Sequence, residues 1–373
     1  MSAPLAPSPL AGEGWGEGDK GHRLGNRKGA IDLALKTLLL ITITTARMIF
    51  PGVPATAPLS PKDKPTAVTN PASKSITMDL SGSQPVDSKS TADMVVPDGL
   101  KVGSAIKLWI DFTKPKTDSA PPEGSSKKIG SPNARYLTYW GSGEKIADGQ
   151  PKVVASGAAA SAPTAAKEAE AKPAESIAPK VPDVSYAYWP GYDSKPIADD
   201  ATTAGAYALT TNYCGNATFT LGPQQNFLPA IELVNLPETF DFAKPIALEW
   251  KSVTNAVAYL LTAYGGSGGD SVMWTSATGP NPPTEIDHWA VPKEALDKYI
   301  EKGLLLPATA TTATIPAGIF KGSTSAMLTV TALGADLIQT KDGIDIHTLV
   351  RSTISVPLVT KPYITHSQPT ESK

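Results

Sequence analysis

The fold is indicated most clearly by an alternating stretch in the last third of the chain. It reads IALEW at residues 246–250 and, after a turn at 254–256, YLLTAY at residues 259–264. Apolar residues at every second position are typical of a β-strand with one face in a core. Two such runs on either side of a short turn predict two successive strands. This part of the chain is therefore expected to be β-structure.

The segments that follow extend the same pattern. Residues 314–318 (TIPAG) precede a turn, and residues 326–334 (AMLTVTALG) read as a further strand. The succession resembles fibronectin type III and related Ig-like sandwiches, in which a Trp on the second strand packs beneath a Tyr-containing third strand. The resemblance covers about residues 229–359 and implies a β-sandwich. One departure is Met327, which stands where such domains often carry the corner tyrosine. A second is an insertion at residues 292–303, which reads as a short helix with Pro near its first turn and Gly after its end.

A second β-rich module is expected over residues 75–228. Its clearest strand is predicted at residues 106–112, where every even position is apolar, and residues 136–140 form an aromatic-rich segment. Residues 207–210 and 219–221 read as two strands joined by a hairpin loop. We therefore expect a mostly β chain with two β-sandwich-like modules, long Pro/Ala-rich loops and one short helix inserted in the C-terminal module.

Linker composition marks three further segments. Residues 58–74 are Pro-rich, and residues 360–373 are expected to be a disordered tail. Residues 155–183 contain 11 Ala and 4 Pro and are predicted to form a long insertion in the N-terminal module. This insertion is interpreted as a spacer, with a partner-binding helix at residues 165–171 as the alternative.

Residues 1–57 are predicted to be a disordered leader and a signal peptide. Basic residues precede an apolar block at residues 38–43, and residues 55–57 (ATA) form a small-residue cleavage site. These features predict cleavage after Ala57 and export to the periplasm or the extracellular space. A membrane anchor is the alternative, but Lys36 and Arg47 leave an apolar block shorter than the ~20 residues that a bilayer requires. No stable membrane insertion is expected after cleavage.

Aromatic residues gather in two short segments on either side of the Ala-rich insertion. We expect the two segments to be neighbouring strands of one sheet. If exposed, their rings can stack on sugar rings or on the apolar surface of a partner, and packing in the core is the alternative. The candidate ligand-binding residues are Tyr139, Trp140, Tyr188, Trp189 and Tyr192.

Composition and motifs disfavour nucleic-acid binding and catalysis. The formal net charge is −2, from 33 Lys plus Arg against 35 Asp plus Glu, so no basic field attracts nucleic acid. His288, His347 and His366 are scattered, and the single Cys214 excludes an internal disulfide. The Gly-rich segment at residues 265–270 lacks the Lys and the helix of a phosphate-binding loop, so it predicts a strand connection. We expect no cofactor and no metal, and an enzyme only if these residues converge in space.

The chain after the leader also resembles exported proteobacterial proteins that carry a Tyr-Trp-Gly segment, here residues 139–141, ahead of a terminal β-sandwich. That resemblance implies an architecture and no activity. The sequence therefore predicts an exported, non-catalytic binding or structural protein whose partner is an unknown protein or a polysaccharide. A carbohydrate-binding module with an exposed aromatic platform is the alternative.

Overall fold

The computed structural model describes residues 37–51, 71–112, 135–155, 177–191 and 194–362. These residues lie within one compact unit of the chain, which begins at Leu35. They form three β-sheets and one α-helix, α1 (Lys293–Glu301). The expectation of a mostly β fold is thus confirmed. Among the described residues, none of the helices has the length and apolar character needed to cross a bilayer.

The largest sheet has 12 strands. They are β1 (Thr37–Met48), β2 (Ser73–Gly82), β5 (Trp109–Ile110), β6 (Arg135–Trp140), β7 (Lys152–Ala155), β8 (Ser185–Trp189), β13 (Ala258–Ser267), β14 (Asp270–Thr275), β15 (Leu306–Pro307), β17 (Ser325–Leu333), β18 (Leu337–Lys341) and β19 (Ile344–Val359). Their order is β5-β8-β2-β1-β19-β17-β13-β14-β6-β7, with β15 paired to β13 and β18 to β19. Strands from both expected modules therefore share one sheet.

Two smaller sheets complete the β-structure. The four-stranded sheet contains β3 (Ala92–Val95), β4 (Ala105–Lys107), β9 (Gly205–Thr211) and β10 (Ala217–Leu221), in the order β10-β9-β3-β4. The three-stranded sheet contains β11 (Leu233–Val234), β12 (Ile246–Trp250) and β16 (Thr312–Ile315), in the order β11-β12-β16. The predicted hairpin of β9 and β10 is present, with antiparallel pairing.

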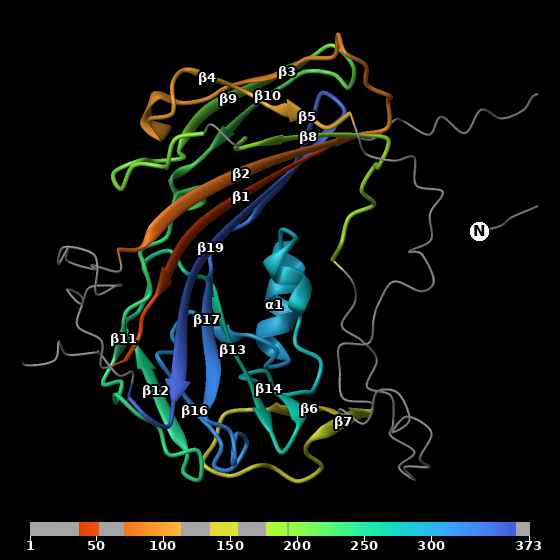
Figure 1. Cartoon of the computed structure of the whole chain (residues 1–373). Coiled ribbons are helices and arrows are strands. Elements are labelled where there is room, and N and C mark those ends of the chain that lie inside the picture. Colours follow the sequence, from red (N-terminus) through yellow and green to blue (C-terminus); the bar gives the residue numbers. More distant parts are fainter. Residues whose placement is uncertain (1–36, 52–70, 113–134, 156–176, 192–193, 363–373) are drawn as a thin grey trace, which may run out of the picture. The chain divides into compact units, whose positions relative to one another are not determined.

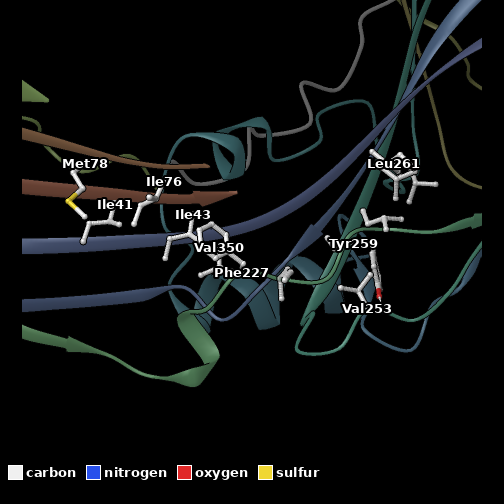
Figure 2. Close-up of a cluster of buried hydrophobic side chains, with 14 of the residues drawn as sticks. Ile41, Ile43, Ile76, Met78, Phe227, Val253, Tyr259, Leu261 and Val350 are labelled. Atoms are coloured by element: carbon white, nitrogen blue, oxygen red, sulfur yellow. Dashed lines mark hydrogen bonds between the residues drawn. The ribbon is translucent and has the colours of Figure 1, made fainter. Parts of the chain in front are cut away.

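Strand β1 lies between β2 and β19, antiparallel to the first and parallel to the second (Figure 1). Its Ile41 and Ile43 are fully buried and pair with Met78 and Ile76 of β2 (Figure 2). An alternating, β-branched apolar run is typical of a buried strand, and its composition also suits the apolar region of a signal peptide.

This arrangement corrects the prediction for the leader. Residues 37–48, which were expected in a disordered leader and signal peptide that ends at residue 57, form an ordered central strand instead. The expected cleavage site at residues 55–57 lies outside the described residues. So do residues 1–36 of the leader, most of the 58–74 linker, the alternative helix at 165–171 and most of the 360–373 tail.

One face of the large sheet, which we call the inner face, carries the main core. Side chains alternate between the two faces of a strand. The buried side chains that point to the inner face, such as Met78 and Leu328, belong to a single cluster. The same cluster includes Tyr207 of the four-stranded sheet and Trp250 of the three-stranded sheet. Both smaller sheets therefore pack on the inner face. The rings of Trp250 and Tyr259 lie 5.4 Å apart.

The opposite, outer face carries a smaller cluster. Leu260 and Leu333 of the sheet pack there against Ile286 and Tyr299. These two residues belong to residues 284–305, which we call the α1 insertion. The insertion therefore covers part of the outer face around β13 and β17.

A buried ion pair fastens the α1 insertion to this face. Arg351 of β19 donates to both carboxylate oxygens of Asp336, at 2.6 and 2.8 Å, and to the carbonyl of Ile286 at 2.7 Å. The Asp336 carboxylate also accepts the backbone N–H groups of Val291 and Val350. Both charged side chains are almost fully buried. The polar groups of this network are thus well satisfied, as burial requires.

Two local predictions are confirmed. Helix α1 follows Pro292 and is followed by Gly303, which has a positive φ. The Gly-rich segment at residues 265–270 contains the connection from β13 to β14, where Gly268 and Gly269 have the positive φ that a tight hairpin turn requires.

The strand predicted at residues 106–112 is instead two short strands in different sheets. β4 pairs with β3, whereas β5 pairs with β8 in the large sheet. Leu108 lies between them, is buried, and its N–H donates to the carbonyl of Ala92 at 2.9 Å. The alternation continues across Leu108, so the pattern alone does not reveal the change of sheet.

Candidate functional site

The two aromatic segments expected to be neighbours lie far apart in the order of the large sheet. Tyr139 and Trp140 belong to β6, which pairs with β14 and β7. Tyr188 and Trp189 belong to β8, which pairs with β2 and β5. The prediction of adjacent strands is therefore wrong, although both strands are in one sheet. Tyr192 lies outside the described residues.

Two of the candidate residues pack in the main core or against it. Trp189 is only 7% exposed and belongs to the main cluster, where it pairs with Met78 of β2. Tyr139 is partly buried against the same cluster. The backbone N–H and C=O of Trp140 are both bonded to the side-chain amide of Gln150, at 2.9 Å each. These residues do not form a shared platform with β8.

Tyr188 has a different environment, because it alternates with Trp189 and faces the outer side of the sheet. Strand β5 places Trp109 directly opposite Tyr188, and strand β2 places Asp79 opposite it on the other side. Side chains directly opposite one another have Cβ atoms about 4.5–5.5 Å apart. Trp109, Tyr188 and Asp79 therefore form a row across three adjacent strands.

A second row lies beside the first. Tyr186 stacks on Tyr188, with ring centroids 5.8 Å apart and planes inclined by 22°, and its hydroxyl donates to the Asp79 carboxylate. Asp111 lies opposite Tyr186, and its backbone N–H donates to the Tyr186 carbonyl at 2.9 Å. We call Trp109, Tyr188, Tyr186, Asp79 and Asp111 the aromatic–acidic face.

The indole of Trp109 is both accessible and held in place. The residue is 50% exposed. A Cβ atom at Gly191 would lie 2.3 Å from the indole Nε1, so the ring packs directly on the backbone of this glycine. Any larger residue at position 191 would displace the ring.

The electrostatics of the face favour hydrogen-bond acceptance. Burial raises the pKa of the Tyr186 hydroxyl, and the hydrogen bond to Asp79 raises it further. Tyr186 therefore stays protonated at neutral pH and keeps donating to Asp79. Ionised carboxylates act only as acceptors, with about four lone-pair sites each. Within the face, the Asp79 carboxylate accepts the Tyr186 hydroxyl.

The residues needed for nucleophilic catalysis are dispersed. The Cys214 sulfur lies 3.3 Å from the Thr211 hydroxyl, and burial raises the pKa of the Cys214 thiol. Burial lowers the pKa of His347, on β19, whereas His288 lies at the end of a 3₁₀ turn in the α1 insertion. Within the described ranges, no three His, Cys, Asp or Glu side chains are grouped closely enough to hold a metal ion. His366 lies outside those ranges.

Sequence reasoning identified Tyr188 and missed its neighbours on the face. Trp109 occupies an odd position of a segment whose even positions are apolar, and that parity marks it as facing away from the core. Asp79 is likewise the polar residue of an alternating strand. In comparisons with known proteins, no family model and no curated protein matches the chain.

Proposed function

We propose that this chain is a non-catalytic binding protein built from two β-sandwich modules, with the aromatic–acidic face as its ligand surface. The observation that carries the proposal is Trp109, half exposed yet held against Gly191. Tryptophan and tyrosine dominate the energetics of binding surfaces because they combine a large apolar area with a polar edge.

The order of the strands supports the modular part of the proposal. We number the strands after β10 in chain order and leave β15 and β18 out of the numbering. The first, second and fifth of them (β11, β12 and β16) form one sheet. The third, sixth and seventh (β13, β17, β19) are neighbours in the other. Ig-like sandwiches divide their strands in this way. The N-terminal module would pair the four-stranded sheet with β5, β8, β2 and β1.

Export is proposed without the cleavage after Ala57. The basic residues ahead of the apolar block and the small residues at 55–57 support it. Strand β1 is part of the main core, so a folded exported chain would have to keep residues 37–48. Cleavage after Ala57 would remove that strand.

Co-sedimentation with insoluble envelope material from the producing cells tests the binding function. We expect the unaltered chain to sediment, and Trp109→Ala to lower its affinity about tenfold, as loss of an aromatic anchor does. Tyr264→Ala is the matched control, because Tyr264 is 51% exposed and lies on β13, outside the aromatic–acidic face. Equal sedimentation of the Trp109→Ala variant and the unaltered chain would overturn the proposal.

A further inference from the structure

A cavity of about 440 Å³ lies where β18 of the large sheet approaches the four-stranded sheet. Cavities of this volume are typical of sites for small ligands. Its lining residues belong to β3, β9, β10 and β18, and they include no member of the aromatic–acidic face. The cavity is therefore a second candidate site, separate from the proposed ligand surface.

The floor of the cavity is formed by short side chains. Thr218 and Val95 both pair with Ala208, so the three residues form a row across β10, β9 and β3. The row crosses two strand spacings, or about 10 Å. Its side chains point away from the large sheet, because the alternating neighbours Tyr207 and Phe219 are buried in the main core. Val95 is 52% exposed, so the apolar part of the floor is accessible to a ligand.

Strand β18 supplies the polar wall of the cavity. It lies close to β10, the end strand of the four-stranded sheet, and contributes Gln339 and Lys341 to the lining. The Nε2 atom of Gln339 is buried and has no hydrogen-bond partner among the described residues. Buried polar atoms normally have a partner. Because the terminal torsion of a glutamine side chain is broad, the amide can turn toward a ligand in the cavity.

The charge of the lining favours a ligand with one negative charge. Lys341 is exposed, forms no ion pair within the part of the chain that the structure describes, and is the charged member of the lining. Asp342, in the adjoining turn, does not line the cavity. Asp345 lies on the opposite face of the hairpin, where its carboxylate accepts the Thr340 hydroxyl at 2.7 Å. One ammonium group matches a carboxylate, whereas a phosphate monoester carries about 1.5–2 negative charges.

We propose that this cavity binds a small organic monocarboxylate with an apolar body. The carboxylate accepts hydrogen bonds from Lys341 and Gln339, and the apolar body lies on Ala208 and Val95. A hydrogen bond between an ammonium group and a carboxylate is charge-assisted and is therefore stronger than a neutral one. The carboxylate can belong to a free acid or to the carboxyl terminus of a peptide, because both present the same chemistry to the cavity.

Saturation-transfer NMR with the full chain measures the binding of defined probes. We expect hexanoate to bind with a dissociation constant in about the millimolar range, as suits so small a ligand. Hexanamide, its uncharged analogue, should bind about tenfold more weakly or worse. Acetyl-trialanine with a free carboxyl terminus and its carboxamide distinguish the two sources. Binding of the free carboxyl form alone assigns the cavity to peptide termini, and binding of hexanoate without either peptide assigns it to free acids.

Three variants locate the bound probe. Lys341→Gln removes the charge and should weaken hexanoate binding about tenfold. Val95→Asp places a negative charge on the floor and should abolish binding. Lys107→Gln is the matched control, because Lys107 is exposed on β4 of the same sheet and does not line the cavity. The melting temperatures of Lys341→Gln and Lys107→Gln should match that of the unaltered chain.

Equal binding of hexanoate by the unaltered chain and by Lys341→Gln would overturn the proposal. Equal affinity for hexanoate and hexanamide would do the same, as would the lack of saturable hexanoate binding up to about 20 mM. Displacement of hexanoate by an equimolar amount of inorganic phosphate would overturn the choice of a carboxylate. Lys341 lies outside the aromatic–acidic face, so none of these results bears on the proposed binding function.

Discussion

The two faces of the 12-stranded sheet use the same residue types in different ways. On the inner face, Trp189 and Trp274 are buried beneath other β-structure. On the outer face, Trp109 and Tyr264 each keep about half of their surface exposed. The inner face is packed against two further sheets, whereas the cluster on the outer face involves the α1 insertion. The layer that covers a strand thus decides whether its aromatic residues are buried in the core or stay partly exposed.

The largest expected effect comes from removing the central strand of the inner face. A chain that begins at Pro58 lacks β1, which exposes Met78 and deprives both β2 and β19 of a neighbour. The loss should exceed the roughly 5–15 kcal/mol that stabilises a typical domain. We expect this chain to be unfolded by circular dichroism and to show no cooperative melting. A chain that begins at Leu35 is the control and should melt cooperatively. Cooperative melting of the shorter chain would contradict the assignment of β1 to the core.

Substitution of one tryptophan on each face compares them directly. Trp189→Ala should reduce the free energy of unfolding by about 3–5 kcal/mol, as large-to-small changes in a core do. Trp109→Ala should cost less than about 1 kcal/mol, because surface substitutions usually have small effects. Urea denaturation of both variants measures the difference. Similar losses for the two would mean that the outer face is as closely packed as the inner face.

The attachment of the α1 insertion to the outer face is tested by Asp336→Ala. This change leaves the Arg351 guanidinium buried without its carboxylate and should cost about 3 kcal/mol or more. Lys293→Ala, in an exposed ion pair with Asp297, is the control and should leave the urea midpoint unchanged. We expect hydrogen exchange in α1 to accelerate in Asp336→Ala. Unchanged exchange would show that apolar packing alone holds the insertion.

The smallest expected effect concerns His347, which lies on the outer-face side of β19 and is 9% exposed. Burial lowers the pKa of His347 in the folded chain, although Asp345 opposes the shift. The unfolded chain therefore binds the proton more readily, and stability falls as the pH drops below about 6.5, the ordinary histidine value. The slope is at most about 1.4 kcal/mol per pH unit.

We expect the decrease in melting temperature between pH 7.5 and pH 5.5 to be smaller for His347→Leu than for the unaltered chain. His288→Leu is the matched control. An equal decrease in the His347→Leu variant would assign the acid sensitivity to other groups.

Local patterns predicted the strands better than they predicted the partners of those strands. The alternation in residues 246–250 and the Pro and Gly around α1 depend on neighbouring residues, and both elements form as expected. The partner of a strand depends on residues far along the chain. The apolar block at residues 38–43 therefore suited a signal peptide as well as a strand, and its strand character is visible only in its pairing with β2 and β19.

Local patterns are equally limited in predicting which residues meet at the candidate site. Tyr188 and Trp189 are consecutive, and alternation alone places them on opposite faces. Which face is covered depends on the packing of the four-stranded sheet, which no local pattern encodes. Trp109 joins the face only because the chain changes sheets at Leu108. A search for aromatic clusters along the sequence finds Tyr188 and overlooks Trp109.

The parallel pairing of β1 with β19 has a consequence for synthesis of the protein. The two strands are separated by roughly 300 residues, and ribosomes add about 5–20 residues per second. Leu39, Ile41 and Ile43 would thus wait about 15–60 s after their own synthesis before β19 emerges. During that interval an apolar, β-forming segment is open to association with other nascent chains. We therefore expect the newly made chain to depend on a chaperone that shields its first strand until its last one is complete.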